Sequence, residues 1–100
     1  MDRFTVTAER TDLTTERTRE VSVSLRVVSK EDGQVWIVME GGPTGHESIQ
    51  ATDHVVRTLQ TRNWVACFGA RGQWDRLVVS AYEMRRFFAQ AGLSYAAEAA

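Results

Sequence analysis

The strongest hydrophobic pattern in the chain lies in segment 74–93, WDRLVVSAYEMRRFFAQAGL. Ser80 and Glu83 form an S-x-x-E capping box, in which the two side chains bind backbone N–H groups at the start of a helix. Val79 before the cap and Met84 after it fit a hydrophobic staple. This pattern predicts a strand that ends at the cap and a helix that begins directly after it.

The predicted helix, 81–91, has one apolar side. At about 100° per residue, five apolar side chains fall in an arc about 120° wide, which is the width of a core-facing stripe. They are Ala81, Met84, Phe87, Phe88 and Ala91. Gly92 supplies the left-handed position that ends many helices, and Leu93 can fold back onto the last turn.

A hairpin is predicted where apolar residues from Val21 to Val27 alternate with polar ones. The following KEDG sequence fits a three-residue loop with a left-handed Gly33. That loop pairs Val27 with Ile37 and keeps both apolar sets on one face, whereas a two- or four-residue loop separates them. The three-residue loop leaves a second group together on the opposite face: Val28, Trp36 and Val38.

The remaining segments complete an α+β pattern. We expect a weak first strand at 4–8, a connection at 11–19, a helix from about 46 to 62, and a strand at 64–68. The order β-β-β-α-β-β-α predicts a mostly antiparallel sheet of about five strands, with two helices packed on one face. We expect one compact domain at 1–93 and a frayed tail at 94–100.

Strand parity assigns the two faces of the last strands. Val79 of the staple points to the helix, so Leu77 points the same way and the alternate residues face away. Those alternate residues are Trp74, Arg76 and Val78, which parity places on the same face as Val28, Trp36 and Val38. A four-residue loop before Trp74 places Trp64, Ala66 and Phe68 in the core, and a five-residue loop reverses them; we favour the first.

Composition narrows the class of protein. The 100 residues suit one domain, and with 43% hydrophobic residues the domain needs no disulfide or metal to fold. The single cysteine excludes an internal disulfide, and we find neither a signal peptide nor an apolar run of membrane-spanning length. We therefore expect a cytoplasmic protein that does not bind membranes.

Catalytic chemistry has weak candidates in His46, His54 and Cys67. On one helix the two histidines would lie about 12 Å apart along the axis, too far to share a metal ion. A cysteine in an apolar strand is most often an inert buried thiol. We expect no enzyme activity, no metal and no cofactor.

Nucleic-acid binding is the alternative function. It would use Trp74 as a stacking platform beside four arginines: Arg57, Arg62, Arg71 and Arg76. A net charge of −1 and the absence of a basic run argue against it.

The expected function is a small, non-catalytic protein-binding module of the adaptor or inhibitor type that phages and mobile elements encode. Small domains seldom expose two tryptophans and several valines on one sheet face unless that face meets something. The expected partner-binding residues are Val28, Trp36, Val38, Trp74, Arg76 and Val78. The partner is either a second copy, giving a homodimer, or a foreign protein.

Overall fold

The computed structural model describes the backbone of residues 3–42, 45–70 and 73–93. Within these ranges it also describes the side chains, except those of 41–46 and 68–73. The described chain forms six strands and two helices. The strands are β1 (Phe4–Asp12), β2 (Thr18–Ser29), β3 (Val35–Gly42), β4 (Gly45–Gln50), β5 (Trp64–Ala70) and β6 (Gln73–Val79), and the helices are α1 (Asp53–Leu59) and α2 (Ala81–Ala91).

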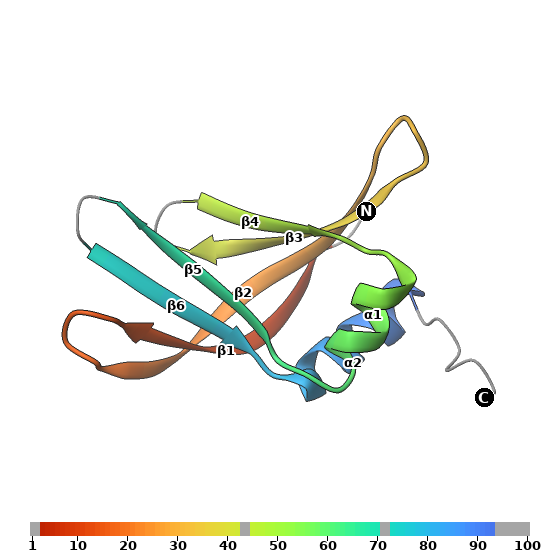
Figure 1. The fold of residues 1–100 in the computed structure, drawn as a ribbon. Helices are drawn as coiled ribbons and strands as arrows, with labels where there is room; N and C mark the ends of the chain where they lie inside the picture. The colour runs from red at the N-terminus through yellow and green to blue at the C-terminus, as the bar shows by residue number, and fades with distance from the viewer. Residues whose placement is uncertain (1–2, 43–44, 71–72, 94–100) are drawn as a thin grey trace.

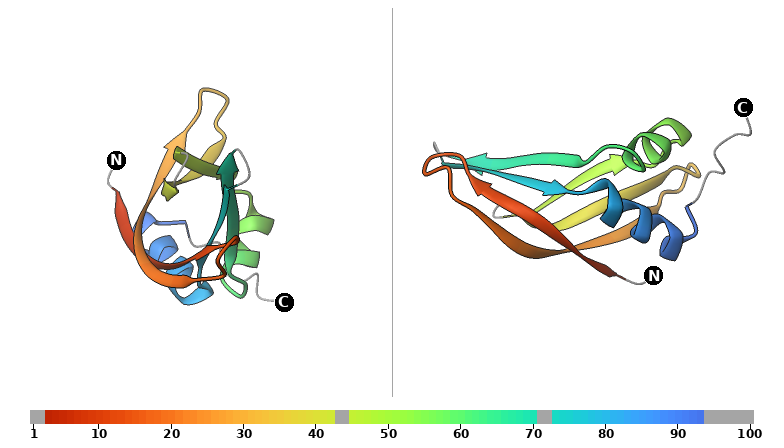
Figure 2. Two further views of the ribbon diagram at one scale, coloured as in Figure 1. Left: turned by 90° about the vertical axis from the view of Figure 1, so that its left-hand side faces the viewer. Right: turned by 90° about the horizontal axis from the view of Figure 1, so that it is seen from below.

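The sheet is antiparallel throughout and has the strand order β4-β3-β2-β1-β6-β5. It curves until it is nearly a barrel, with both helices at one end and the β1–β2 turn at the other (Figures 1 and 2). The predicted α+β class is therefore confirmed, with six strands in place of about five.

The concave face of the sheet holds the core. Its strands contribute Val6, Val23, Leu25, Ile37, Met39, Trp64, Leu77 and Val79 among the buried residues, and α2 adds Met84, Phe87 and Phe88. The Phe4 and Phe87 rings meet edge to face, with centroids 5.6 Å apart. Trp64 and Ala66 face this core, as predicted, while the side chain of Phe68 lies outside the described residues.

Local signals at α2 and in the β2–β3 hairpin are confirmed. Ser80 Oγ accepts a hydrogen bond from the Glu83 N–H at 3.2 Å, and Gly92 is left-handed with φ 71°. The hairpin pairs Val27 with Ile37, as the three-residue loop requires, and Gly33 has φ 82°. One detail differs: the Glu83 carboxylate accepts from the Thr7 N–H at 3.2 Å, so it joins α2 to β1.

The helix predicted at 46–62 is wrong in its first part. Residues 45–50 form β4, which pairs with β3 and sets Ile49 beside Ile37. The helix begins only after Thr52, whose Oγ1 accepts from the Val55 N–H at 3.2 Å. Ile49 fits a helical stripe as well as a strand, and the backbone hydrogen bonds that β3 offers decide for the strand.

Asn63, in the connection between α1 and β5, contacts the start of α2. Helix α1 ends at Leu59, with Gln60 as its C-cap. The Asn63 Oδ1 accepts a hydrogen bond from the Ala81 N–H at 3.1 Å, so a side chain 18 residues earlier in the sequence helps to cap the start of α2. Arg85 also joins the two helices, because its Nη1 donates to the Gln60 carbonyl at 2.7 Å.

The segment expected as a connection at 11–19 contains a connection at 13–17, and its two ends belong to β1 and β2. Thr11 and Thr18 are partners in the β1–β2 ladder, and their hydroxyls lie 2.8 Å apart. The Asp12 Oδ1 accepts from the N–H groups of Thr14 and Thr15, at 2.8 and 3.2 Å. These two bonds lower the pKa of Asp12, whose ionised carboxylate holds the turn. The tail expected at 94–100 lies outside the described residues.

Candidate functional site

The six residues expected to bind a partner all lie on the convex face of the sheet, but in two separate groups. Strand β1 and the part of β2 that pairs with it lie between the groups. On this face they carry polar and charged side chains, with Thr5 opposite Ser24, Thr7 opposite Ser22 and Glu9 opposite Glu20. The expectation of one continuous apolar surface is therefore wrong, because parity decides the face of a residue whereas strand order decides its neighbours.

The first group lies in a groove on β2, β3 and β4. The Trp36 groove has a volume of about 200 Å³ and is lined by Arg26, Val28, Lys30, Trp36, Val38 and Ser48. Trp36 already has partners within the chain. The Lys30 Nζ lies 4.7 Å from the centroid of its ring, and the indole N–H donates to Gln34 Oε1 at 3.2 Å. Val38 is only 8% exposed, so this group offers little free apolar surface.

The second group lies on the last two strands, and we call it the β5–β6 strip. It consists of Val65, Cys67, Trp74, Arg76 and Val78. The register sets Val65 beside Val78 and Cys67 beside Arg76. Trp74 is 48% exposed and Val65 is 53% exposed, so two large apolar side chains reach solvent on the same face.

Strand β5 is also an unpaired edge of the sheet. Among the described residues β5 pairs only with β6, through an unbroken register, and its sequence, WVACFGA, has no charge and no proline. Natural edge strands usually contain a charged residue, a proline or a bulge, and these features prevent pairing with another chain. The other edge strand, β4, has two of these features. It contains the charged Glu47, and its pairing with β3 is irregular, with a register shift between Glu40 and Gly42.

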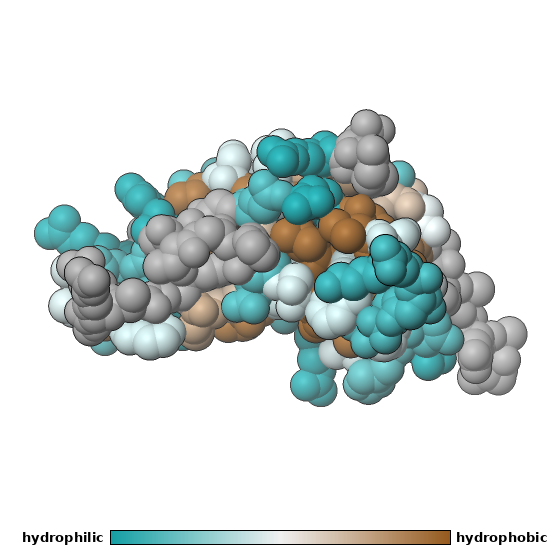
Figure 3. Space-filling view, turned by 90° about the horizontal axis from the view of Figure 1, so that it is seen from above, coloured by the Kyte–Doolittle hydropathy of each residue, from teal (hydrophilic) through white to brown (hydrophobic). Residues whose placement is uncertain are grey.

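The barrel stays open between these two edges. Strands β4 and β5 are not neighbours in the hydrogen-bonded order. A hydrophobic area bordered by hydrophilic side chains reaches the surface in the view from above (Figure 3).

Two of the catalytic candidates have described side chains, and they lie on different elements, Cys67 on β5 and His54 on α1. Cys67 is exposed on β5, contrary to the expected buried thiol, because the alternation along β5 that buries Trp64 and Ala66 turns Cys67 to the convex face. His54 is exposed on α1, and the side chain of His46 lies outside the described residues. Within the described part of the chain, no three metal-binding side chains gather, and no helix is long and apolar enough to cross a membrane.

The arginines of the nucleic-acid alternative are distributed over different elements. Arg57 lies on α1, Arg62 in the connection after it, and Arg76 on the convex face of β6. Arg71 lies outside the described residues. The described arginines of this set therefore come from a helix, a loop and a strand, and do not follow one continuous element.

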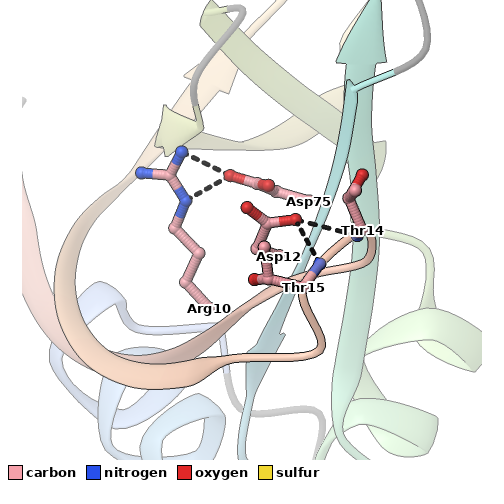
Figure 4. Close-up of polar contacts among 5 residues, drawn as sticks. All are labelled: Arg10, Asp12, Thr14, Thr15 and Asp75. Atoms are coloured by element: carbon pink, nitrogen blue, oxygen red, sulfur yellow. Dashed lines mark hydrogen bonds and ion pairs between the residues drawn. The ribbon is translucent and has the colours of Figure 1, made fainter.

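Sequence reasoning missed a charged cluster at the end of the concave face away from the helices (Figure 4). There the Arg10 Nε donates to Asp75 Oδ2 at 2.5 Å, and a second Arg10 nitrogen contacts the same oxygen. The signal was present in β1, whose inward positions change from apolar Val6 and Ala8 to charged Arg10 and Asp12.

Comparison with known proteins gave no match to a family model, to a curated protein or to a solved structure.

Proposed function

We propose that the protein is a small, non-catalytic protein-binding module of the adaptor or inhibitor type, and that the β5–β6 strip is its main docking surface. The observation that carries this proposal is the joint exposure of Trp74 and Val65 on the convex face. Tryptophan and arginine are the residues most enriched at binding hot spots, and the strip holds Trp74 next to Arg76.

Trp74 has enough exposed surface to anchor a partner. Covering its exposed half removes about 100 Å² from water, which contributes about 2–3 kcal/mol. The indole is 48% exposed, in contrast to Trp36, which is half-buried against Lys30 and Gln34. We propose the Trp36 groove, with Val28 and Val38, as a separate and weaker contact surface.

The free edge of β5 suits addition of a strand from the partner. Main-chain hydrogen bonds along the edge supply affinity, and the side chains beside it supply specificity. A second copy of the chain is the first partner to test. Antiparallel pairing of β5 with itself, centred on Cys67, sets no like charges opposite one another, because the strand is uncharged.

The Trp74→Ala variant tests the docking surface. We expect it to weaken association by about 2 kcal/mol or more, roughly 30-fold in Kd, while the melting temperature changes little. Sedimentation equilibrium measures association with a second copy. For a foreign partner captured from the source cell, titration calorimetry measures the same loss.

Trp36→Ala is the matched control, since it removes the same side chain from the other group. We expect it to change association by less than about 1 kcal/mol, because Trp36 already packs on its own chain. If Trp74→Ala associates normally and melts far lower, Trp74 stabilises the monomer and the docking proposal is wrong.

Salt dependence separates a protein partner from a nucleic acid. A protein that neutralises several phosphates loses affinity steeply as salt rises. The logarithm of its association constant falls with the logarithm of the salt concentration, with a slope of about −0.7 to −0.9 for each phosphate contact. We expect no tight binding to random DNA or RNA at physiological salt, as measured by fluorescence anisotropy. Submicromolar binding that Arg76→Ala and Arg62→Ala both weaken would favour the nucleic-acid alternative.

A further inference from the structure

A polar cavity occupies the end of the concave face farthest from the helices. Its volume is about 490 Å³, within the range of small-molecule sites. The side chains that matter for its chemistry are those of Arg10, Asp12, Arg17, Arg19 and Asp75. It lies on the opposite face of the sheet from the β5–β6 strip and is independent of the proposed docking function.

The charges in this cavity are not required to build the sheet. The side chains of Arg10 and Asp75 are only 25% and 14% exposed, and a partly buried ion pair seldom adds stability beyond that of apolar residues of similar size. The pair has a geometric consequence instead. Asp75 engages two nitrogens of Arg10, and the third points away from Asp75 (Figure 4).

Two further arginines at the cavity, Arg17 and Arg19, have no side-chain partner among the described residues. Arg19 is directly opposite Arg10 in the β1–β2 register, and like charges in that relation are destabilising. The guanidinium groups of Arg17 and Arg19 have no ion pair or hydrogen bond among the described residues. A bound anion would offset the repulsion between Arg10 and Arg19.

We propose that this cavity binds a phosphate-bearing small molecule. Guanidinium groups suit phosphate because their planar, divergent donors match its oxygens. The free nitrogen of Arg10, with Arg17 and Arg19, binds the phosphate. The volume is larger than a bare phosphate needs, and it leaves room for the remainder of the ligand.

Asp12 has a complementary role toward the rest of the ligand. Its Oδ1 accepts the N–H groups of Thr14 and Thr15, which hold the carboxylate at the cavity (Figure 4). The Asp12 carboxylate lines the cavity, where it accepts a ligand hydroxyl. A phosphorylated polyol or sugar phosphate provides both groups, the phosphate and the hydroxyl.

Titration calorimetry and thermal melting at constant ionic strength test this site, with inorganic phosphate, ribose 5-phosphate, ribose and acetate as the probes. We expect both phosphates to bind and to raise Tm, with ribose 5-phosphate at least about tenfold tighter because its hydroxyls reach Asp12. Ribose and acetate should leave Tm unchanged. Arg19→Gln should weaken ribose 5-phosphate binding at least about tenfold, since one charge-assisted contact is lost.

Arg62→Gln is the matched control, because Arg62 is also exposed but lies in the connection after α1. It should bind ribose 5-phosphate like the natural chain. Arg17→Gln provides a second variant should Arg19→Gln unfold, which the Tm of the free protein would reveal. Absence of binding, equal binding of acetate, or an equal loss in Arg62→Gln would overturn the proposal.

Discussion

Replacing Phe88 with alanine is expected to lower the free energy of unfolding by about 3–5 kcal/mol. Phe88 lies on α2, is 1% exposed, and has its ring centroid 5.7 Å from that of Phe87. The substitution removes a large side chain from the centre of the core and leaves a cavity that the curved sheet cannot easily close. Urea denaturation followed by circular dichroism measures the loss.

Tyr82 on the same helix is the control for this prediction. Its side chain is 63% exposed, so Tyr82→Ala should change the free energy of unfolding by no more than about 0.5 kcal/mol. A Phe88→Ala cost below about 1 kcal/mol would mean that a different face of α2 contacts the sheet.

Replacing Asp75 with alanine is expected to cost about 2–3 kcal/mol of unfolding free energy. The change removes the carboxylate that binds two nitrogens of the Arg10 guanidinium. The Arg10 side chain is only 25% exposed, so its charge stays partly buried. A charge that stays partly buried without a partner is costly, and that cost is larger than the net stabilisation from the pair itself. Urea denaturation at neutral pH gives the magnitude.

Replacing both partners of the pair tests whether the charges themselves stabilise the sheet. Arg10→Met combined with Asp75→Leu should be more stable than Asp75→Ala alone, because apolar side chains of similar length remove both charges together. If the double variant is the less stable of the two, the charges contribute net stability to the sheet, and the argument that they serve a ligand weakens.

The chain by itself determined the elements whose causes are local. The cap of α2 depends on Ser80, the end of the helix on Gly92, and the β2–β3 register on the KEDG loop. In each case a few neighbouring residues restrict the backbone or place apolar side chains on one face, and this effect does not depend on tertiary contacts. Such features are predictable because their energies arise within one turn or one pair of strands.

Tertiary structure decided what depends on partners distant in sequence. Residues 45–50 fit a helix or a strand by periodicity, and β3 supplied the hydrogen bonds that selected the strand. Parity placed Trp36 and Trp74 on one face, but only the strand order set β1 and β2 between them. The charged inward positions of β1 can be read from the sequence, but Arg10 and Asp75 lie 65 residues apart on β1 and β6, so no local pattern identifies Asp75 as the partner. Contacts that form only after the sheet has assembled leave no periodic signal in the sequence, because periodicity within one segment does not specify which distant segment it will pack against.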